Sequence, residues 1–300
     1  MEKKRIVAVV VTYNRKELLL ECLSRLAAQR FDAMAASLNV LVVDNASTDG
    51  TGEAVIPVLA NGLGEYCNTG KNLGGAGGFN YGMRLAVEAG CDYLWVMDDD
   101  CLPSEDALAA FLNAHAELEG AYGFLSSVVR WTDGSICKMN VQRHPLTRDI
   151  EDFSPRLQPV TLASFVSLFV PARVVREVGL PFKEFFIWTD DWEFTRRVSR
   201  RHPCFVVGDS IVVHASKTNN PGTIVDDAPE RLDRYRLIYR NDVVLYRQEG
   251  LFGWLFLIAR ALYHIALVLL KSKGDRLKKI SIIVSSNLAG LRFHPRVEYV

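Results

Sequence analysis

An apolar run that ends in three consecutive acids is the feature that most restricts the fold of this chain. Residues 93–97 are large and apolar, Asp98, Asp99 and Asp100 follow them directly, and Pro103 comes soon after. Such a run is typical of a strand buried on both faces of a parallel sheet, which a proline does not continue. We therefore expect the aspartates at the carboxyl edge of the sheet, where open α/β sheets bind ligands.

Three adjacent carboxylates repel one another unless a cation neutralises them. Asp98 and Asp100 are spaced so that both can coordinate one hard cation, such as Mg²⁺ or Mn²⁺, through oxygen. An acidic turn that caps a helix beginning near Ser104 explains the same residues without a metal. The choice between these interpretations depends on the rest of the chain.

Two earlier apolar runs also end in polar residues. Residues 6–11 lead to Thr12, Asn14 and Arg15, and residues 40–43 lead to Asp44 and Asn45. The spacing of the leucines between these runs predicts a helix over 16–28. Strand, helix and strand in this order are the opening of a doubly wound sheet.

Residues 74–78 hold four glycines, after a short strand expected near 65–67 and before a helix expected to end near Ala89. Glycines here let the backbone approach a phosphate, or let the helix pack tightly on the sheet, and both interpretations stay open. The spacing does not fit a dinucleotide-binding fingerprint.

A second acidic cluster, residues 188–193, combines Asp190, Asp191 and Glu193 with two tryptophans at the expected start of a helix. Acids favour a helix start because of its dipole, and the arginines of the same helix would balance them. His214 follows another apolar run. A lone histidine in such a place is either a satisfied core residue or a ligand.

Charge and cysteine content exclude some classes of protein. Lys and Arg together number 35, as do Asp and Glu, so no overall charge favours nucleic-acid binding. The six cysteines form no C-x-x-C pair, which indicates free thiols in a reducing compartment. The basic start of the chain is not followed by a signal-peptide cleavage site, so we expect a cytoplasmic protein.

Four motifs taken together resemble the family-2 inverting glycosyltransferases of the GT-A fold. They are Val-Val-Thr-Tyr-Asn-Arg at 10–15, Val-Val-Asp-Asn-Ala-Ser-Thr-Asp-Gly at 42–50, Lys-Asn-Leu-Gly-Gly-Ala-Gly-Gly-Phe at 71–79 and Met-Asp-Asp-Asp at 97–100. The glycine-rich motif and Trp-Thr-Asp-Asp-Trp-Glu at 188–193 resemble the branch of galactofuranosyltransferases and rhamnosyltransferases that builds bacterial polysaccharides. The resemblance covers roughly residues 5–220.

The resemblance implies an α/β fold with a Rossmann-like, mostly parallel sheet flanked by helices. We expect a catalytic domain over 1–225, with a nucleotide-sugar half (1–103) and an acceptor half (104–225), and a helical extension over 226–300. The implied reaction is metal-dependent, inverting hexosyl transfer from a nucleoside diphosphate sugar to a saccharide or lipid-linked acceptor in cell-wall and cell-surface polysaccharide synthesis. UDP-galactofuranose is the favoured donor, with dTDP-rhamnose as the alternative.

Roles for individual residues follow from the same resemblance. Asp191 is the expected general base, with Asp190 and Glu193 as helpers, and Trp188 and Trp192 are expected to contact the acceptor. The metal, Mn²⁺ or Mg²⁺, is expected on Asp98, Asp100 and His214. The expected nucleotide-sugar contacts are Thr12, Asn14, Arg15, Asp44, Asn45, Lys71, Asn72, Gly74, Gly75, Asp98 and Asp99.

Residues 251–270 form an apolar stretch long enough to cross a bilayer. Arg260 would be costly inside a membrane, and it shares a polar stripe with Gly253, His264 and Lys271. A helix of this kind suits the membrane interface, with the basic residues over 271–279 near lipid headgroups. We expect contact through 251–280 with the inner face of the cell membrane; a buried helix of an accessory bundle, or a homo-oligomer contact, is the alternative.

Two other classes of function fit part of the chain. A nicotinamide-dependent oxidoreductase could bind its cofactor at the glycine-rich turn, but its reaction does not require three adjacent acids. A non-catalytic membrane scaffold explains the C-terminal helices alone, and it predicts that loss of Asp191 has no consequence.

Overall fold

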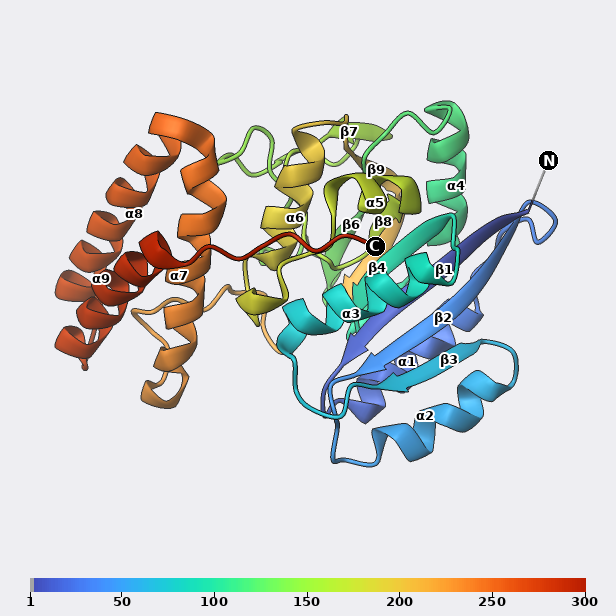
Figure 1. Cartoon of the computed structure of the whole chain (residues 1–300), viewed down its shortest axis with the longest axis horizontal. Coiled ribbons are helices and arrows are strands. Elements are labelled where there is room, and N and C mark those ends of the chain that lie inside the picture. Colours follow the sequence, from blue (N-terminus) through green and yellow to red (C-terminus); the bar gives the residue numbers. More distant parts are fainter. Residues whose placement is uncertain (1–2) are drawn as a thin grey trace.

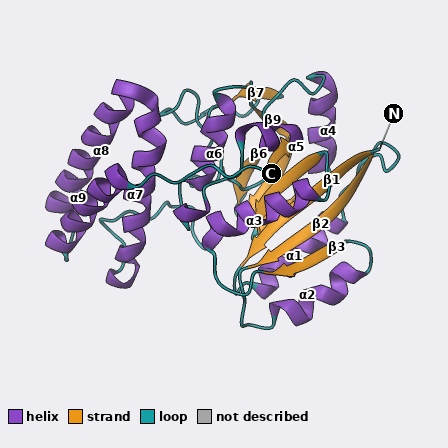
Figure 2. Ribbon diagram, in the orientation of Figure 1, coloured by secondary structure: helices purple, strands orange, loops and turns teal. Residues whose placement is uncertain are grey.

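The computed structural model describes residues 3–300 and contains a single sheet of nine strands within that range (Figures 1 and 2). The strands are β1 (Lys4–Thr12), β2 (Ala36–Asp44), β3 (Gly64–Asn68), β4 (Tyr93–Asp98), β5 (Cys101–Pro103), β6 (Leu125–Trp131), β7 (Leu157–Pro159), β8 (Leu168–Pro171) and β9 (Phe205–His214). The helices are α1 (Lys16–Ala27), α2 (Thr51–Ala60), α3 (Gly74–Glu88), α4 (Ala107–Glu117), α5 (Ala172–Val178), α6 (Asp190–Ser199), α7 (Tyr235–Tyr246), α8 (Gly250–Lys271) and α9 (Arg276–Arg292).

The strand order is β3-β2-β1-β4-β8-β6-β9-β5, and β7 pairs with β9. The first four strands are parallel, as a Rossmann-like half requires. β8 runs antiparallel to both β4 and β6, so the second half of the sheet is mixed. The predicted α/β class and GT-A-like architecture are confirmed.

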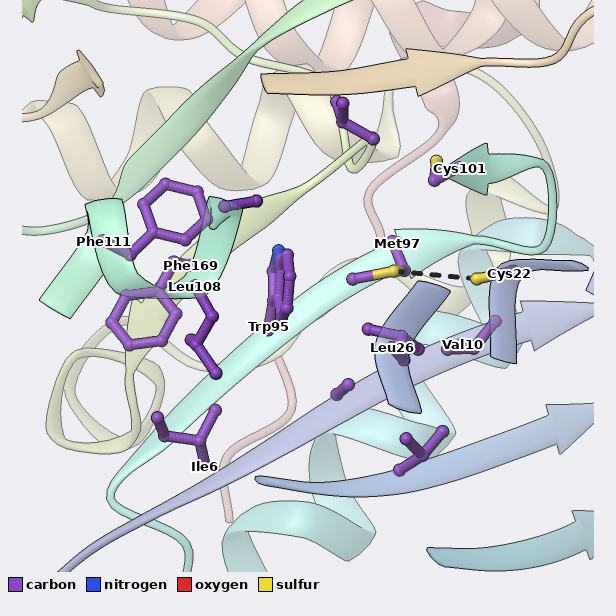
Figure 3. Packing of buried hydrophobic residues seen from close by; sticks show 14 of the residues in the cluster. Ile6, Val10, Cys22, Leu26, Trp95, Met97, Cys101, Leu108, Phe111 and Phe169 are labelled. Atoms are coloured by element: carbon purple, nitrogen blue, oxygen red, sulfur yellow. Dashed lines mark hydrogen bonds between the residues drawn. The ribbon is translucent and has the colours of Figure 1, made fainter. Parts of the chain in front are cut away.

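Helices cover both faces of the sheet because the strand residues alternate between them. Ile6, Ala8 and Val10 of β1 face a cluster that contains the apolar sides of α1, α2 and α4. Val9 and Val11 face the opposite cluster, which contains α3, α5 and α6. Figure 3 shows the first cluster around Trp95 and Met97 of β4. The strand that ends in the aspartates is therefore buried on both faces, as its composition predicts.

The sequence predicts that the helix starts after the glycine-rich segment. Helix α3 instead begins at Gly74 and includes that segment in its first turns. The glycines let this helix approach the sheet closely. A Cβ atom on Gly82 would meet Val9 Cγ1 at 2.6 Å and Val43 Cγ2 at 2.7 Å. A Cβ atom on Gly78 would meet Val11 Cγ1 at 2.6 Å. Tight packing therefore accounts for the glycines that lie deeper in α3.

The C-terminal helices α7, α8 and α9 pack together beside the sheet, at the left of Figure 1. The helical run Pro229–Lys271 is long and apolar enough to cross a membrane, and only 17% of its apolar stretch is buried. Arg260 and His264 of its polar stripe face the neighbouring helix α7: Arg260 forms an ion pair with Asp242, and the Tyr239 hydroxyl lies 2.7 Å from His264 Nδ1. Arg260 is thus paired inside the protein.

The basic residues from the end of α8 to the first turn of α9 are mostly exposed, but Lys279 differs from our expectation. Its ammonium group is buried and donates hydrogen bonds to Val225 O at 2.7 Å and to Ser272 Oγ at 2.9 Å. Lys279 therefore closes the turn between the two helices, and it does not face lipid headgroups.

The last residues return from α9 to the helices beside the sheet (Figure 1). The amide of Leu180 donates to Glu298 O at 2.8 Å, and the Glu298 carboxylate pairs with Arg84 and Lys183. Phe293 packs on Phe185. The terminal segment therefore connects the extension to the chain that precedes α6.

Replacement of Gly82 by alanine should destabilise the protein, whereas the same change at Gly75 should not. A Cβ atom on Gly82 overpacks the contact with β1 and β2, a defect that typically costs about 1–3 kcal/mol, while a Cβ atom on Gly75 meets no described atom within 4 Å. Urea unfolding of Gly82→Ala and Gly75→Ala measures both free energies. Equal values for the two variants would contradict the packing role.

Candidate active site

The polar residues at the ends of three adjacent parallel strands lie at one edge of the sheet. Val11 of β1 pairs with Asp98 of β4, and Thr12 of β1 pairs with Asp44 of β2. This register brings the ends of three of the four recognised motifs together, as expected for the carboxyl edge of a parallel sheet.

The three aspartates of the β4 end differ in their surroundings. Asp99 and Asp100 are buried, and Asp98 remains partly exposed. Thr12 Oγ1 donates to Asp99 Oδ2 at 2.7 Å, and Arg15 Nη1 lies 2.6 Å from Asp100 Oδ2 and 3.3 Å from Asp99 Oδ1. Arg15 and Thr12, which we expected to contact the nucleotide sugar, therefore bind the aspartates directly.

His214, at the end of β9, meets Asp100 from the other side. Its Nε2 atom lies 3.2 Å from Asp100 Oδ1, and its Nδ1 atom lies 2.7 Å from Asn140 Oδ1. Burial would lower the pKa of His214, but the Asp100 carboxylate outweighs burial and raises this pKa to about 10. Because Asn140 Oδ1 accepts from Nδ1, the imidazole is oriented with Nε2 toward the aspartates.

The donor atoms at this edge fit a hard divalent cation. Ligand atoms of Asp98, Asp100 and Cys101 lie within 4.8 Å of one another. Asp100 Oδ1 is buried and, within residues 3–300, forms no well-aligned hydrogen bond; its contact with His214 Nε2 at 3.2 Å is an ion pair only. Burial raises the pKa of the Cys101 thiol far above its ordinary value, and Mg²⁺ and Mn²⁺ prefer oxygen, so the two carboxylates are the suitable ligands. His214 pairs with Asp100 as an imidazolium in the absence of a cation, and it would have to release that proton to join them as a ligand.

The end of β2 and the turn after β1 form the adjoining part of the edge. Asp44 is buried, accepts from Tyr66 Oη at 2.6 Å and accepts from the Ser47 amide at 2.8 Å. Asn14 has φ 53° and accepts from the Thr48 amide at 2.7 Å. These bonds hold the two turns against each other, next to the aspartates.

The glycine-rich segment borders the same edge through its first residues. Asn45 Nδ2 donates to Gly74 O at 3.1 Å, and Asn72 Oδ1 accepts from the Gly74 amide at 2.8 Å. Gly74 has φ 72°, and a Cβ atom there would meet Phe186 O at 2.1 Å, so only glycine fits. Gly75 has open space at its Cβ position, and Lys71 is exposed on the preceding loop. Gly74 and Gly75 therefore differ in role from Gly78 and Gly82.

The second acidic cluster begins helix α6 and approaches the first. Asp190 is buried, and burial is the largest cause of its raised pKa. The negative charge of Asp191 raises the pKa further, and that of Asp98 adds a smaller contribution. The two clusters are thus electrostatically linked. Burial also raises the pKa of Asp191 to about 6, and Asp191 keeps part of its surface exposed. A partly exposed carboxylate with this pKa suits a general base.

The other residues of the second cluster have protein partners. Both carboxylate oxygens of Glu193 bond to Arg197, at 3.1 and 2.8 Å. Arg143 lies 4.1 Å above the ring of Trp192, and Arg234 lies 5.0 Å from the ring of Trp188. Both tryptophans remain partly exposed. Each tryptophan thus packs against an arginine and keeps some exposed surface, whereas the Glu193 carboxylate already has a structural partner.

Sequence reasoning missed several residues that shape the site. Tyr66 bonds to Asp44, Asn140 orients His214, and Asn241 and Asp242 of α7 bond to the segment before Asp191. No periodicity indicates such partners. The only available signal is the presence of Asn and Asp in a helix that is otherwise rich in Arg, Tyr and aliphatic residues.

Comparison with known proteins agrees with this geometry. The Glycosyl transferase family 2 profile matches residues 7–156. Galactofuranosyltransferase GlfT1 of Mycolicibacterium smegmatis is 29% identical over 281 residues, which cover 85% of this chain and 90% of the relative. GlfT1 of Mycobacterium tuberculosis is 28% identical over 279 residues, with the same coverage.

Solved structures share the fold at low sequence identity. The Pyrobaculum calidifontis mannosyltransferase PcManGT, in complex with GDP-Man and Mn²⁺, has a TM-score of 0.59 at 18% identity and covers 98% of this chain and 77% of its own. S. aureus TarS 1-349, in complex with UDP-GlcNAc, has a TM-score of 0.56 at 15% identity, covering 96% and 73%.

The family profile covers half of the chain, and it includes the acids at the end of β4 and the motifs at the ends of β1 and β2. This match favours a glycosyltransferase over the oxidoreductase and the scaffold. The chain belongs to glycosyl transferase family 2 and is a glycosyltransferase that uses a nucleotide-sugar donor.

Proposed function

We propose that this enzyme transfers galactofuranose from UDP-galactofuranose to a saccharide or lipid-linked acceptor in the synthesis of a bacterial cell-wall polysaccharide. The observation that carries the proposal is the similarity to GlfT1, which extends over 85% of this chain and so includes the acids at the end of β4 and the second acidic cluster. Two segments resemble this branch, Gly74 to Gly78 and Trp188 to Glu193, and the first contacts the chain just before the second: the Ala76 amide donates to Phe186 O at 3.1 Å.

The donor would bind along the edge formed by β1, β2 and β4. The turns that carry Asn14 and the buried Asp44 would face the base and ribose, the start of α3 with Asn72 would face the diphosphate and sugar, and Asp98 would lie between the two. Mn²⁺ or Mg²⁺, held by Asp98, Asp100 and His214, would neutralise the diphosphate that leaves with the nucleotide. Arg15 and Thr12 hold Asp99 and Asp100 in the geometry that this binding requires.

Asp191 would accept the proton of the acceptor hydroxyl as that hydroxyl attacks the anomeric carbon. With a pKa of about 6, Asp191 is still mostly ionised at neutral pH, and it is more basic than an ordinary carboxylate. Attack from the face opposite the leaving nucleotide inverts the anomeric configuration without a covalent sugar intermediate. Trp188 and Trp192 flank the base and would contact the acceptor.

We also propose that α8 and α9 rest on the inner face of the cell membrane, as part of a C-terminal extension that follows a catalytic domain ending near residue 225. Leu255, Ile258 and Leu262 of α8 are exposed, and so are Lys271 and Lys273 at its end. An exposed apolar face beside basic residues suits a bilayer with anionic headgroups. Such a position would give access to a lipid-linked acceptor.

Purified enzyme with Mn²⁺ should release UDP from UDP-galactofuranose faster than it releases nucleotide from dTDP-rhamnose, UDP-glucose or GDP-mannose. EDTA should abolish release, and Asp100→Asn should lower kcat by about 100-fold or more, because the leaving diphosphate loses several kcal/mol of stabilisation. Nucleotide release followed by an enzyme-coupled assay measures both. If the enzyme prefers dTDP-rhamnose, the donor is dTDP-rhamnose and not UDP-galactofuranose. Nucleotide release that continues in the presence of EDTA would contradict the metal site.

Asp191→Asn should keep UDP binding and lose turnover by roughly 10²–10⁴-fold, the usual contribution of a general base. In the unmodified enzyme kcat should fall below pH about 6, because the carboxylate is then protonated. The variant should lack that dependence. Steady-state kinetics over a range around this pKa, about pH 5 to 8, measures kcat, and calorimetric titration measures UDP binding. A variant with weak UDP binding and intact turnover would exclude Asp191 as the base.

Vesicle flotation tests the membrane proposal. The protein should float with vesicles that contain phosphatidylglycerol, and Leu255→Glu combined with Leu262→Glu should prevent flotation, because charges on the apolar face oppose its burial in lipid. Met34→Glu is the control, because it changes an exposed apolar residue that is far from α8 in the sequence. If the double variant floats unchanged, or if only the state of association changes in gel filtration, the face does not bind lipid.

A further inference from the structure

The segment that carries the proposed base has an unusual backbone. Phe186, Trp188 and Thr189, which directly precede Asp190 and Asp191, have φ values of 65°, 67° and 69°. Non-glycine residues rarely adopt such values, and for the β-branched Thr189 the conformation is strained. A strained segment persists only where surrounding contacts determine it. The contacts that hold this one therefore matter for the position of Asp191.

Asn241 of α7 supplies the first set of contacts. Its side chain is fully buried, and Nδ2 lies 3.1, 3.2 and 3.0 Å from the carbonyl oxygens of Phe185, Ile187 and Trp188. Its Oδ1 atom accepts from Arg240 Nε at 3.0 Å. One carboxamide thus bonds to three carbonyls of the strained segment, and its own acceptor is satisfied as well.

Asp242 supplies the second contact. Its Oδ1 atom accepts from Thr189 Oγ1 at 2.7 Å, and its other oxygen pairs with Arg260 of α8. Thr189 occupies the N-cap position of α6 but makes no side-chain cap, because its hydroxyl donates to Asp242 instead. The start of the helix that bears Asp191 is therefore bonded to a helix of the C-terminal extension.

We propose that Asn241 and Asp242 are positioning residues for the reaction: they hold the segment 185–189 in its strained conformation and thereby place Asp191 for proton transfer. The C-terminal extension then completes the acceptor side of the active site in addition to any contact with a membrane. The inference rests on the proposed role of Asp191, and it goes beyond that role by assigning the residues that set its geometry.

A matched pair at Thr189 tests the inference with little change in shape. Thr189→Val removes the hydroxyl that Asp242 accepts, and Thr189→Ser keeps it. We expect kcat to fall about 10- to 100-fold for the valine variant, because a misplaced catalytic group costs about that much. The serine variant should stay within about threefold, since it keeps that hydroxyl bond. The affinity for UDP with Mn²⁺ should be the same for both, because the donor edge is unchanged.

Asn241→Asp provides a second test, since it keeps the size of the side chain and removes the donor that the three carbonyls share. Lys279→Met is its control: Lys279 is also buried in the extension, but its bonds go to Val225 and Ser272. We expect Asn241→Asp to lower kcat with UDP affinity retained, and Lys279→Met to lower the melting temperature with kcat retained. If Asn241→Asp does not fold, the Thr189 pair decides.

Equal kcat values for Thr189→Val and Thr189→Ser would overturn the inference. It would also be overturned if, in every variant including Lys279→Met, kcat fell in proportion to the melting temperature. The proposed function fails separately. If Asp191→Asn remains active, the assignment of the base is wrong whatever the Thr189 pair shows. If Asp191→Asn is inactive and Thr189→Val is fully active, only the positioning role is wrong.

Discussion

The mutual repulsion of the aspartates at the end of β4 is the constraint on which the site depends. A buried carboxylate is costly without a cation or a hydrogen-bond donor, and Asp99 and Asp100 are both buried. The chain supplies Arg15 from the first strand-to-helix turn and His214 from the end of β9. Residues that are far apart in the sequence therefore meet here for an electrostatic reason, and the same arrangement offers a divalent ion its ligands.

The first half of the fold could be predicted because its signals are local. Each of the buried strands β1, β2 and β4 is a continuous apolar run that ends in polar residues, and parallel strands bring such ends to one edge. The second half could not be predicted as well. β8 begins only at Leu168, because Ser167 has φ 64° and its hydroxyl bonds to Trp95 inside the core, and that contact leaves no pattern in the sequence.

The same distinction applies to the active site. Asp98, Asp100 and Asp191 stand in motifs, so their positions could be predicted from the chain alone. Asn140, Asn241 and Asp242 act through side-chain bonds to segments roughly 50 or more residues away, as the separations of 74, 53 and 53 residues from His214, Trp188 and Thr189 show. Composition and period carry no information about such pairs. The polar stripe of α8 was recognised, but its partner, Asp242, became evident only from the packing of α7 against α8.

The return of the terminal segment to the sheet also bears on how the enzyme is handled in the laboratory. Glu298 bonds to the chain at Leu180 and Lys183, a few residues before the segment that holds the base, whereas β1 starts at the far end of the sheet in Figure 1. Truncation of the chain after α9 would remove these bonds, and a bulky fusion partner joined at Val300 would strain them. Affinity tags for purification or immobilisation are better attached ahead of β1.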